Sequence, residues 1–317
     1  MGDLSRTFPP LTGSLTSQCS EGLLGFSGTT RLAPRPTLLP TLKNVTQIVC
    51  GVDHVLALTS TGKVFSWGNG QQLQLGRRVV ERTRLNNLLP REFGLKNIRA
   101  IGAGSYHSFA IANDGTVYAW GLNQFGQCGI DRQGFVGEDG AVIASPSVVE
   151  ALAGVNVVAV TGGEHHSVAL TAEGQVYSFG RMDCNQLGFT DAAPPPGTVF
   201  DSRGKARFTP HPTVIPNIPP MKKVFCGSHH NIAIAEDGSA WSWGFGEVWQ
   251  VGHGPHTTEN PSGDIETPTK IVNTATKGVR MVCGGAGGQF SVLCGIPEEV
   301  ESLTVPKAKP VGRKSRQ

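Results

Sequence analysis

Short apolar runs alternate with single polar residues and glycines in a spacing that occurs four times along the chain. Each copy opens with Gly-x-x-His, has a second glycine eight positions after the histidine, and has an aromatic residue followed by glycine thirteen positions after it. The opening and closing glycines are 25 positions apart in every copy. The copies occupy residues 51–76, 104–129, 163–188 and 227–252. Four copies with the same internal spacings predict a repeat fold.

Each copy also predicts a β-hairpin. An apolar run such as residues 55–58 follows the histidine, a polar turn such as Asn113-Asp114-Gly115 comes next, and a second run ends at the aromatic residue. The turn glycine supplies the positive φ that a tight turn needs. A further strand is expected before each opening glycine, at residues 45–49, 98–101, 157–160 and 223–225. Units of about 40 to 50 residues made only of strands are typical of an all-β propeller, in which neighbouring blades cover each other's apolar faces.

The repeat divides the chain into three parts. Residues 1–17 carry no repeat feature, residues 18–297 hold the repeats, and residues 298–317 form a polar, basic tail that we expect to be disordered. The expected repeat units are one partial, four full and one partial, at residues 18–43, 44–96, 97–154, 155–220, 221–278 and 279–297. Two insertions, at residues 131–144 and 189–213, are expected to be surface excursions without an assigned role.

Composition agrees with a turn-rich β protein. Of 317 residues, 16% are charged and 42 are glycine, which argues against a helical fold. The net charge of +3 is too small to predict nucleic-acid binding by itself. Seven cysteines without framework spacing are expected to be reduced thiols of the cytosol or nucleus. The sequence has no apolar run long enough to span a membrane and no secretory signal at its start, so we expect no membrane partner.

Histidines are the candidate chemical groups. His165-His166 and His229-His230 suggest a metal site, but neighbours in a strand point to opposite faces, and no HExxH or CxxC accompanies them. We therefore expect no metal, cofactor or small-molecule substrate. The histidines that recur in every copy are interpreted as structural, each ring bonding a neighbouring backbone group and tying one blade to the next: His54, His107, His166 and His230. The preceding position varies, so the repeat leaves it free to serve a site: Asp53, Tyr106, His165 and His229.

At these residues the sequence resembles a known family. Gly-x-x-His, the turn glycine, Trp-Gly and the QLG-like ending are similar to the seven-bladed propellers named after the regulator of chromosome condensation, over about residues 18–295. The stretches VFSWGNGQQLQLGRR, LNQFGQCG and WGFGEVWQVGHGP resemble the fungal members in particular. The resemblance implies a guanine-nucleotide exchange factor for the small GTPase Ran. Such a factor acts by non-covalent binding in the nucleus on chromatin, with histones as a further partner and the cytoplasm as a second location.

The resemblance also implies site residues. Asp53 and His165 fall where the family carries residues needed for exchange, and Arg77 matches a residue that pairs with an acidic group on the GTPase. A protruding wedge directed at the nucleotide-binding region matches Gln18, Cys19, Ser20, Glu21, Gly22, Leu23, Leu24 and Gly25.

Repeat length bears on how much of such a ring is present. Successive repeat histidines are 53, 59 and 64 residues apart, and seven such units need on the order of 400 residues. We therefore expect an N-terminally incomplete member of the family that forms an open arc of about five blades. Two other functions remain open. One is a propeller scaffold that binds a partner without exchange activity. The other is a hydrolase that uses the histidines, for which the sequence shows no nucleophile or carboxylate at a workable spacing.

Overall fold

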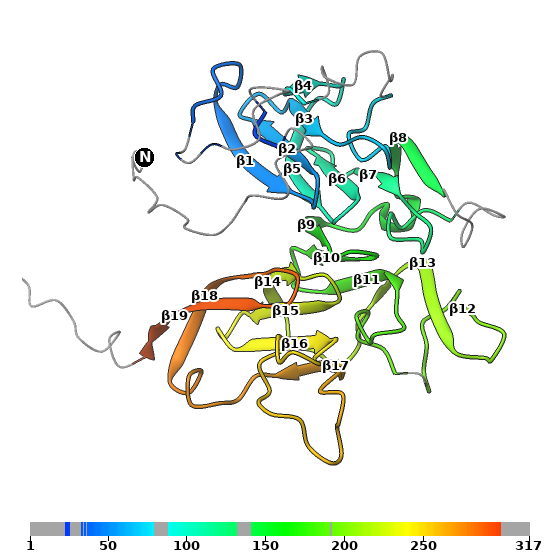
Figure 1. Cartoon of the computed structure of the whole chain (residues 1–317), viewed down its shortest axis with the longest axis vertical. Coiled ribbons are helices and arrows are strands. Elements are labelled where there is room, and N and C mark those ends of the chain that lie inside the picture. The colour runs from blue at the N-terminus through cyan, green and yellow to red at the C-terminus, as the bar shows by residue number, and fades with distance from the viewer. Residues whose placement is uncertain are drawn as a thin grey trace, which may run out of the picture.

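The chain folds into sheets that follow one another along an arc. The computed structural model describes residues 23–25, 33, 35, 37–78, 88–131, 141–190 and 192–298. Within these residues the strands form four sheets of four or five strands and one two-stranded sheet. Figure 1 shows the first sheet in blue and the last in orange at the two ends of the arc. This arrangement confirms an all-β, propeller-like fold with four full blades and a partial one. No helix in the described part of the chain is long and apolar enough to cross a bilayer.

Nineteen strands are assigned in the described residues. The first two blades contain β1 (Val45–Cys50), β2 (His54–Thr59), β3 (Val64–Gly68), β4 (Arg91–Glu92), β5 (Ile98–Ala103), β6 (His107–Ala112), β7 (Val117–Leu122) and β8 (Val142–Val148). The third and fourth contain β9 (Val157–Gly162), β10 (His166–Thr171), β11 (Val176–Arg181), β12 (Val199–Phe200), β13 (Ala206–Val214), β14 (Met221–Cys226), β15 (His230–Ala235), β16 (Ala240–Gly244) and β17 (Ile265–Lys270). The partial blade contains β18 (Val279–Ala286) and β19 (Ser291–Pro297).

Each full blade is an antiparallel meander whose second strand is completely buried. Every residue of β2, β6, β10 and β15 is buried, because this strand lies between two strands of its own sheet and packs against neighbouring parts of the arc. The third blade adds β12 outside β13, and both come from the long insertion after the third repeat. Burial on both faces explains why these runs are apolar from the second residue after the histidine, except for a threonine that ends two of them.

The opening glycine of each repeat lies directly under the repeat histidine. A Cβ atom built on Gly51, Gly104, Gly163 or Gly227 would stand 2.1–2.2 Å from the Cε1 atom of the histidine three residues later. Real Cβ atoms do not approach so closely, so only glycine lets the ring fold back over the chain. In the partial blade the ring of Phe290 lies in the same way over Gly287. The fixed Gly-x-x-His spacing therefore follows from the packing of the ring.

The repeat histidine joins each blade to the next through a side chain. His54 Nε2 lies 2.8 Å from Ser108 Oγ, and Ser108 Oγ donates to the Gln74 carbonyl oxygen at 2.9 Å. The serine proton is thus used, so Nε2 of the histidine must carry the proton and donate it. The later blades repeat this contact, with distances of 2.7, 2.9 and 2.9 Å, in His107–Ser167, His166–Asn231 and His230–Ser291. The partner is a side chain, not the backbone group expected from the sequence, because the next buried strand places its second residue against the ring.

The closing glutamine of each of the first three repeats supplies a carbonyl to the next blade. Trp120 Nε1 donates to the Gln74 carbonyl oxygen at 2.8 Å, and Trp243 Nε1 donates to that of Gln186 at 3.2 Å. In the first blade Trp67 Nε1 donates to the Leu23 carbonyl oxygen at 3.0 Å. Leu23 therefore holds the place that a repeat-closing glutamine has in the later repeats.

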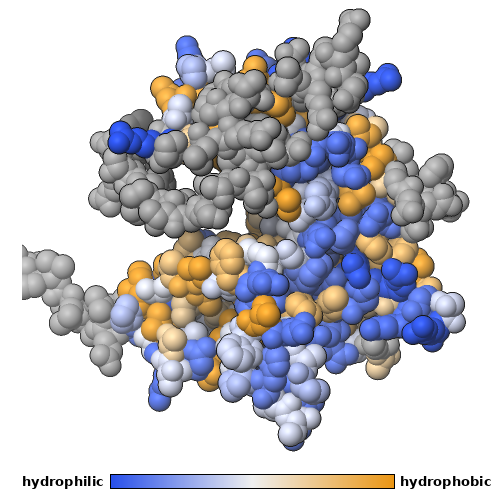
Figure 2. Space-filling view, in the orientation of Figure 1, coloured by the Kyte–Doolittle hydropathy of each residue, from blue (hydrophilic) through white to orange (hydrophobic). Residues whose placement is uncertain are grey.

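Backbone hydrogen bonds also link the blades near the axis. Ser105 N donates to the Gly163 carbonyl oxygen at 2.9 Å, and Glu164 N donates to that of Ser228 at 2.9 Å. Within the described residues, sheet hydrogen bonds do not join β1 to β18 or β19. Figure 2 shows hydrophobic residues gathered over the last sheet, where Phe290 is 62% and Val292 53% exposed.

We predict that Gly104→Ala destabilises the fold by about 1–3 kcal/mol, because its methyl group would overlap the His107 ring. Chemical denaturation with fluorescence detection measures the change. Gly285→Ala is the matched control, since no atom lies within 4 Å of a Cβ built there, and its effect should stay within roughly 0.5 kcal/mol. Equal effects of the two substitutions would contradict the packing argument.

We also predict a loss of stability on the acid side. Burial lowers the pKa of His54 and of His230 from 6.5 to about 4, and that of His166 to about 3. The unfolded chain therefore binds more protons than the folded chain below pH 6.5, so stability falls as the pH drops from 6.5 toward 4. Melting temperatures between pH 7.5 and 5 measure the slope. A flat profile over this range would contradict the prediction, and His54→Gln should make the slope shallower.

Candidate functional site

A row of four partly buried side chains lies at one end of the blades. Asp53, Tyr106, His165 and His229 each precede a repeat histidine, in the loop between the first and second strands. Next to them lie the loops between the third and fourth strands, as the contact of Gln74 with Asp53 shows. The turn between the second and third strands lies at the opposite end, because the strands are antiparallel. We call these four residues the upper row.

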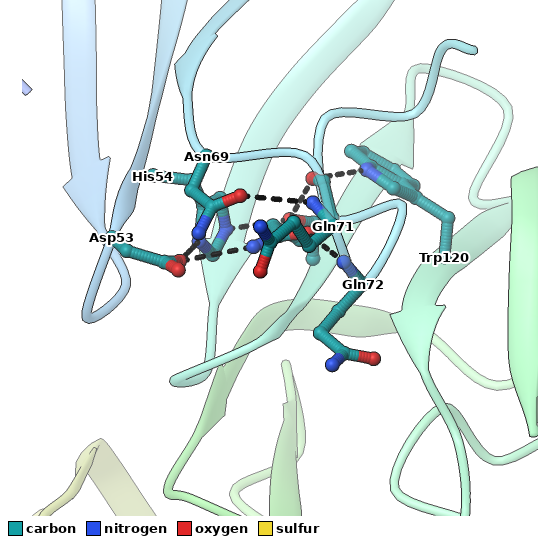
Figure 3. Close-up of polar contacts among 8 residues, drawn as sticks. Asp53, His54, Asn69, Gln71, Gln72 and Trp120 are labelled. Carbon is teal, nitrogen blue, oxygen red and sulfur yellow. Dashed lines mark hydrogen bonds and ion pairs between the residues drawn. The ribbon is translucent and has the colours of Figure 1, made fainter. Parts of the chain in front are cut away.

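The Asp53 end of the upper row is a closed network of hydrogen bonds (Figure 3). Gln74 Nε2 donates to Asp53 Oδ1 at 2.9 Å, and Gln74 Oε1 accepts from Gln72 N at 2.9 Å. Asn69 N donates to the Asp53 carbonyl oxygen at 2.8 Å. A Cβ atom on Gly68 would lie 2.4 Å from that oxygen, so the Trp-Gly glycine allows this approach. The Asp53 side chain remains 17% exposed and is held in one orientation.

His165 is braced by an aromatic ring and by charges. The Phe125 ring stands edge-on to it, with 5.0 Å between centroids, and the Arg181 guanidinium lies 5.2 Å from the Phe125 centroid. Arg181 Nε and Nη2 donate to the two carboxylate oxygens of Asp183 at 2.7 and 2.9 Å. The pKa of His165 is lowered from 6.5, mainly by burial, while Glu164 raises it and Arg181 lowers it. His165 is therefore a neutral imidazole at pH 7.

Glu164 connects three members of the upper row. Its Oε2 atom lies 3.1 Å from His229 Nε2 in the next blade, and its Oε1 atom lies 3.9 Å from His165 Nδ1. The pKa of Tyr106 is raised by burial and then by the negative charges of Asp53 and Glu164. The upper row is therefore electrostatically continuous from the first blade to the fourth. Asp53 and His165, which the family resemblance implies as exchange residues, lie on this same face.

Arg77 and the described part of the expected wedge contact other parts of the first blade. Arg77 Nη2 donates to the Ser66 carbonyl oxygen at 3.4 Å, and burial together with the positive charge of Arg91 lowers the pKa of Arg77. Ser66 and Arg91 pair across β3 and β4, so Arg77 belongs to the outer part of the first blade. Of the expected wedge, residues 18–22 lie outside the described residues. Leu23 and Gly25 pack against Trp67.

The chemistry available on this face is binding by charge and hydrogen bonds. In the described residues, no three His, Cys, Asp or Glu side chains are arranged to hold a metal ion. The Ser108–His54 pair has the distance of a hydrolase dyad, but both side chains are fully buried and the serine hydroxyl already donates to a carbonyl. A catalytic serine needs an accessible oxygen and a basic partner, and burial lowers the pKa of His54 to about 4.

The axis of the arc holds a small cavity of about 170 Å³. Its lining is the inner ends of the blades, mostly glycine and serine residues such as Gly104, Gly163 and Ser228. Ligand sites usually enclose about 300–1,000 Å³ with apolar and aromatic walls. This cavity is therefore part of the packing of the blades.

Four residues around the upper row could not be assigned from the repeat pattern. Glu164, Phe125, Arg181 and Asp183 occupy positions that differ from copy to copy, so the spacing carries no signal for them. Phe125 also packs on Phe208, with 5.8 Å between centroids. Phe208 lies in β13, inside the 189–213 insertion that was expected to be a surface excursion. The insertion thus supports the upper row.

Comparisons with known proteins agree with this architecture. Residues 12–293 match the sequence model described as the RCC1-like domain. The chain is 48% identical over 286 residues to "Protein pim1" of Schizosaccharomyces pombe, covering 90% of this chain and 52% of that protein. It is 44% identical over 284 residues to "Guanine nucleotide exchange factor SRM1" of Saccharomyces cerevisiae, covering 89% of this chain and 57% of that protein.

A solved structure is similar over the same region. The crystal structure of Prp20p from Saccharomyces cerevisiae, a protein studied for its binding to Gsp1p and histones, superposes with a TM-score of 0.81 at 44% identity. The match covers 88% of this chain and 63% of that one. The chain thus spans between half and two thirds of the length of these relatives.

We predict that two substitutions shift the pKa of His165 in opposite directions. Glu164→Gln should lower it further, because the anion that favours the imidazolium is lost. Arg181→Gln should raise it, because a nearby cation is lost and Asp183 is left uncompensated. Titration of the imidazole signals by NMR measures both shifts. Shifts of the same sign would contradict the assigned charges, and Glu236→Gln, at the opposite end of the blades, should leave the value unchanged.

Proposed function

Because this chain belongs to the RCC1-like domain family, we propose that it presents the GTPase-binding face of a guanine-nucleotide exchange factor for a Ran-type small GTPase. The observation that carries the proposal is the upper row, in which Asp53 and His165 lie on one face of rigid blades and are held by fixed neighbours. The relatives support it, since one of them is named a guanine nucleotide exchange factor and another was studied with Gsp1p.

The proposed mechanism is non-covalent. Small GTPases hold their nucleotide through a P-loop and Mg²⁺, so an exchange factor must bind the nucleotide-free form more tightly than the loaded form. Linkage then requires it to weaken nucleotide binding by the same factor. The upper row suits this task, because its side chains are already oriented and little binding energy is lost in ordering them.

Each part of the upper row has a distinct proposed role. The Asp53 carboxylate, held by Gln74 and still partly exposed, accepts hydrogen bonds from the GTPase. His165, neutral and braced by Phe125, both donates and accepts without adding a charge. Arg77 is proposed to pair with an acidic group of the GTPase. Residues 18–25 are proposed to reach toward the nucleotide-binding region.

We further propose a nuclear, chromatin-bound location with histones as a second partner. Two findings support this proposal. The similar protein Prp20p was studied for its binding to histones, and the chain belongs to the RCC1-like domain family. The repeats of residues 18–297 are proposed to act as one binding unit, with residues 1–17 and 298–317 outside it. Roles in nucleocytoplasmic transport and the cell cycle follow from exchange on a Ran-type GTPase.

A second candidate function is binding without exchange. It is favoured by the placement of Leu23 and Gly25, which pack against Trp67 in the first blade. Part of the segment assigned to the wedge thus has a structural role. A scaffold of the same repeat type would use the upper row for affinity alone.

Release of a fluorescent GDP analogue from a Ran-type GTPase, in excess GTP, tests the proposal. The chain should accelerate release. Asp53→Ala and His165→Ala should each reduce the acceleration by roughly tenfold to a hundredfold, because each removes polar contacts worth about 1.5–3 kcal/mol.

Glu236→Ala is the matched control, because Glu236 is exposed in the turn at the opposite end of the fourth blade. It should leave the rate unchanged. Binding to the nucleotide-free GTPase without accelerated release would favour the scaffold. Absence of both binding and release would overturn the proposed function.

A further inference from the structure

The two strands of the partial blade bring two cysteines face to face. In the antiparallel pairing of β18 with β19, Cys283 stands directly opposite Cys294. Both residues are exposed, and both carry free thiols. In Figure 1 these strands lie at the orange end of the arc. Directly opposed residues project from the same face of a sheet, so the two thiols share one surface.

The backbone distance in such a pair fits a disulfide bond. Directly opposed residues of an antiparallel ladder have Cα atoms about 4.5–5.5 Å apart. Disulfides join residues whose Cα atoms are about 4.4–6.8 Å apart. Rotation about the Cα–Cβ bonds is therefore sufficient to bring the sulfur atoms together, and the strands do not have to move.

A bulge in β18 produces this alignment. The register shifts between Met281, which pairs with Gly295, and Cys283, which pairs with Cys294. If the register of Met281 with Gly295 continued without the shift, Val282 would stand opposite Cys294. The bulge is held from the neighbouring blade, since Lys223 Nζ donates to the Val282 carbonyl oxygen at 2.7 Å. The juxtaposition of the cysteines is therefore built into the packing of β18 on β14.

The other cysteines of the described part are placed differently. Cys50 is exposed but stands opposite Val55, and Cys226 stands opposite Asn231. Cys128 is buried, and burial raises the pKa of the Cys184 thiol to about 11. Within the described residues, Cys283 and Cys294 are thus the one pair of cysteines opposed across a ladder.

We propose that Cys283 and Cys294 form a reversible oxidation site, a cross-strand disulfide made by a peroxide. One thiolate attacks an oxygen of hydrogen peroxide, the O–O bond breaks, and the products are a sulfenic acid and hydroxide. The second thiol attacks that sulfur and expels water, so two thiols lose two protons and two electrons while the peroxide is reduced to two waters. A dithiol reductant reverses the bond by exchange.

The disulfide would join β18 to β19 covalently and so stabilise the last sheet. Two-stranded sheets are marginal unless they pack on other elements, and Val292 and Ile296 of β19 are exposed apolar side chains. Closing the short loop between residues 283 and 294 removes freedom from the unfolded chain. The oxidised protein should therefore unfold at a higher temperature, with the gain confined to the last blade.

Peptide mapping of the full chain tests the site. The purified protein is treated with hydrogen peroxide, alkylated without reduction, digested with trypsin and analysed by mass spectrometry. Both cysteines fall in the tryptic peptide of residues 281–307. This peptide should lose two hydrogen atoms and resist alkylation, and dithiothreitol treatment before alkylation should restore two alkylated thiols.

Variants separate a specific pair from general thiol oxidation. Cys283→Ser should abolish the internal bond and leave Cys294 open to alkylation or further oxidation. Cys50→Ser, which removes an exposed cysteine without a partner, should leave the bond intact. Lys223→Met, which removes the contact to the bulge, should slow its formation. Oxidation of Cys283 and Cys294 to separate sulfinic acids, or crosslinking only between molecules, would overturn the proposal.

Discussion

The structure depends on one buried hydrogen bond that recurs from blade to blade. A neutral histidine donates from Nε2 to a serine or asparagine in the next sheet, and that side chain donates in turn to a glutamine carbonyl of the histidine's own blade. Most buried polar groups in proteins are paired. This relay pairs the Nε2 atom of each ring, whereas the Nδ1 atoms of the same four histidines are buried without a hydrogen-bond partner in the described residues. The relay also fixes the ring, which requires glycine three residues earlier.

The same constraint creates the candidate site. Because the histidine is fixed in the interior, the residue before it must lie at the surface end of the blade. The relay sets where that residue stands but not what it is. Asp53, Tyr106, His165 and His229 can therefore differ in chemistry while sharing one position. Glu164 and Phe125 then connect them into a continuous polar face.

Much of the fold could be predicted from the sequence, because glycine, histidine and tryptophan recur for steric reasons that act within one or two blades. The strands upstream of Gly51 and Gly104 and the hairpins after them are where the spacing places them. The partner of the histidine could not be predicted. Ser108 and Asn231 are unremarkable residues of apolar runs until the next blade is placed beside them. Likewise, Phe125 packs on both His165 and Phe208, which are distant from it in the sequence. Phe208 lies in an insertion without repeat spacing, so the pattern carries no signal for this contact.

The direction of the relay has a consequence for biosynthesis. His54 finds Ser108, and the Gln74 carbonyl finds Trp120, only after the following sheet exists. Each sheet that leaves the ribosome thus has these polar groups exposed to water until the next sheet covers them. Chains are synthesised at about 5–20 residues per second, and successive repeat histidines are more than fifty residues apart. The inter-blade hydrogen bonds of a blade therefore form seconds after that blade has been synthesised. During translation, the most recently made blade always lacks these contacts.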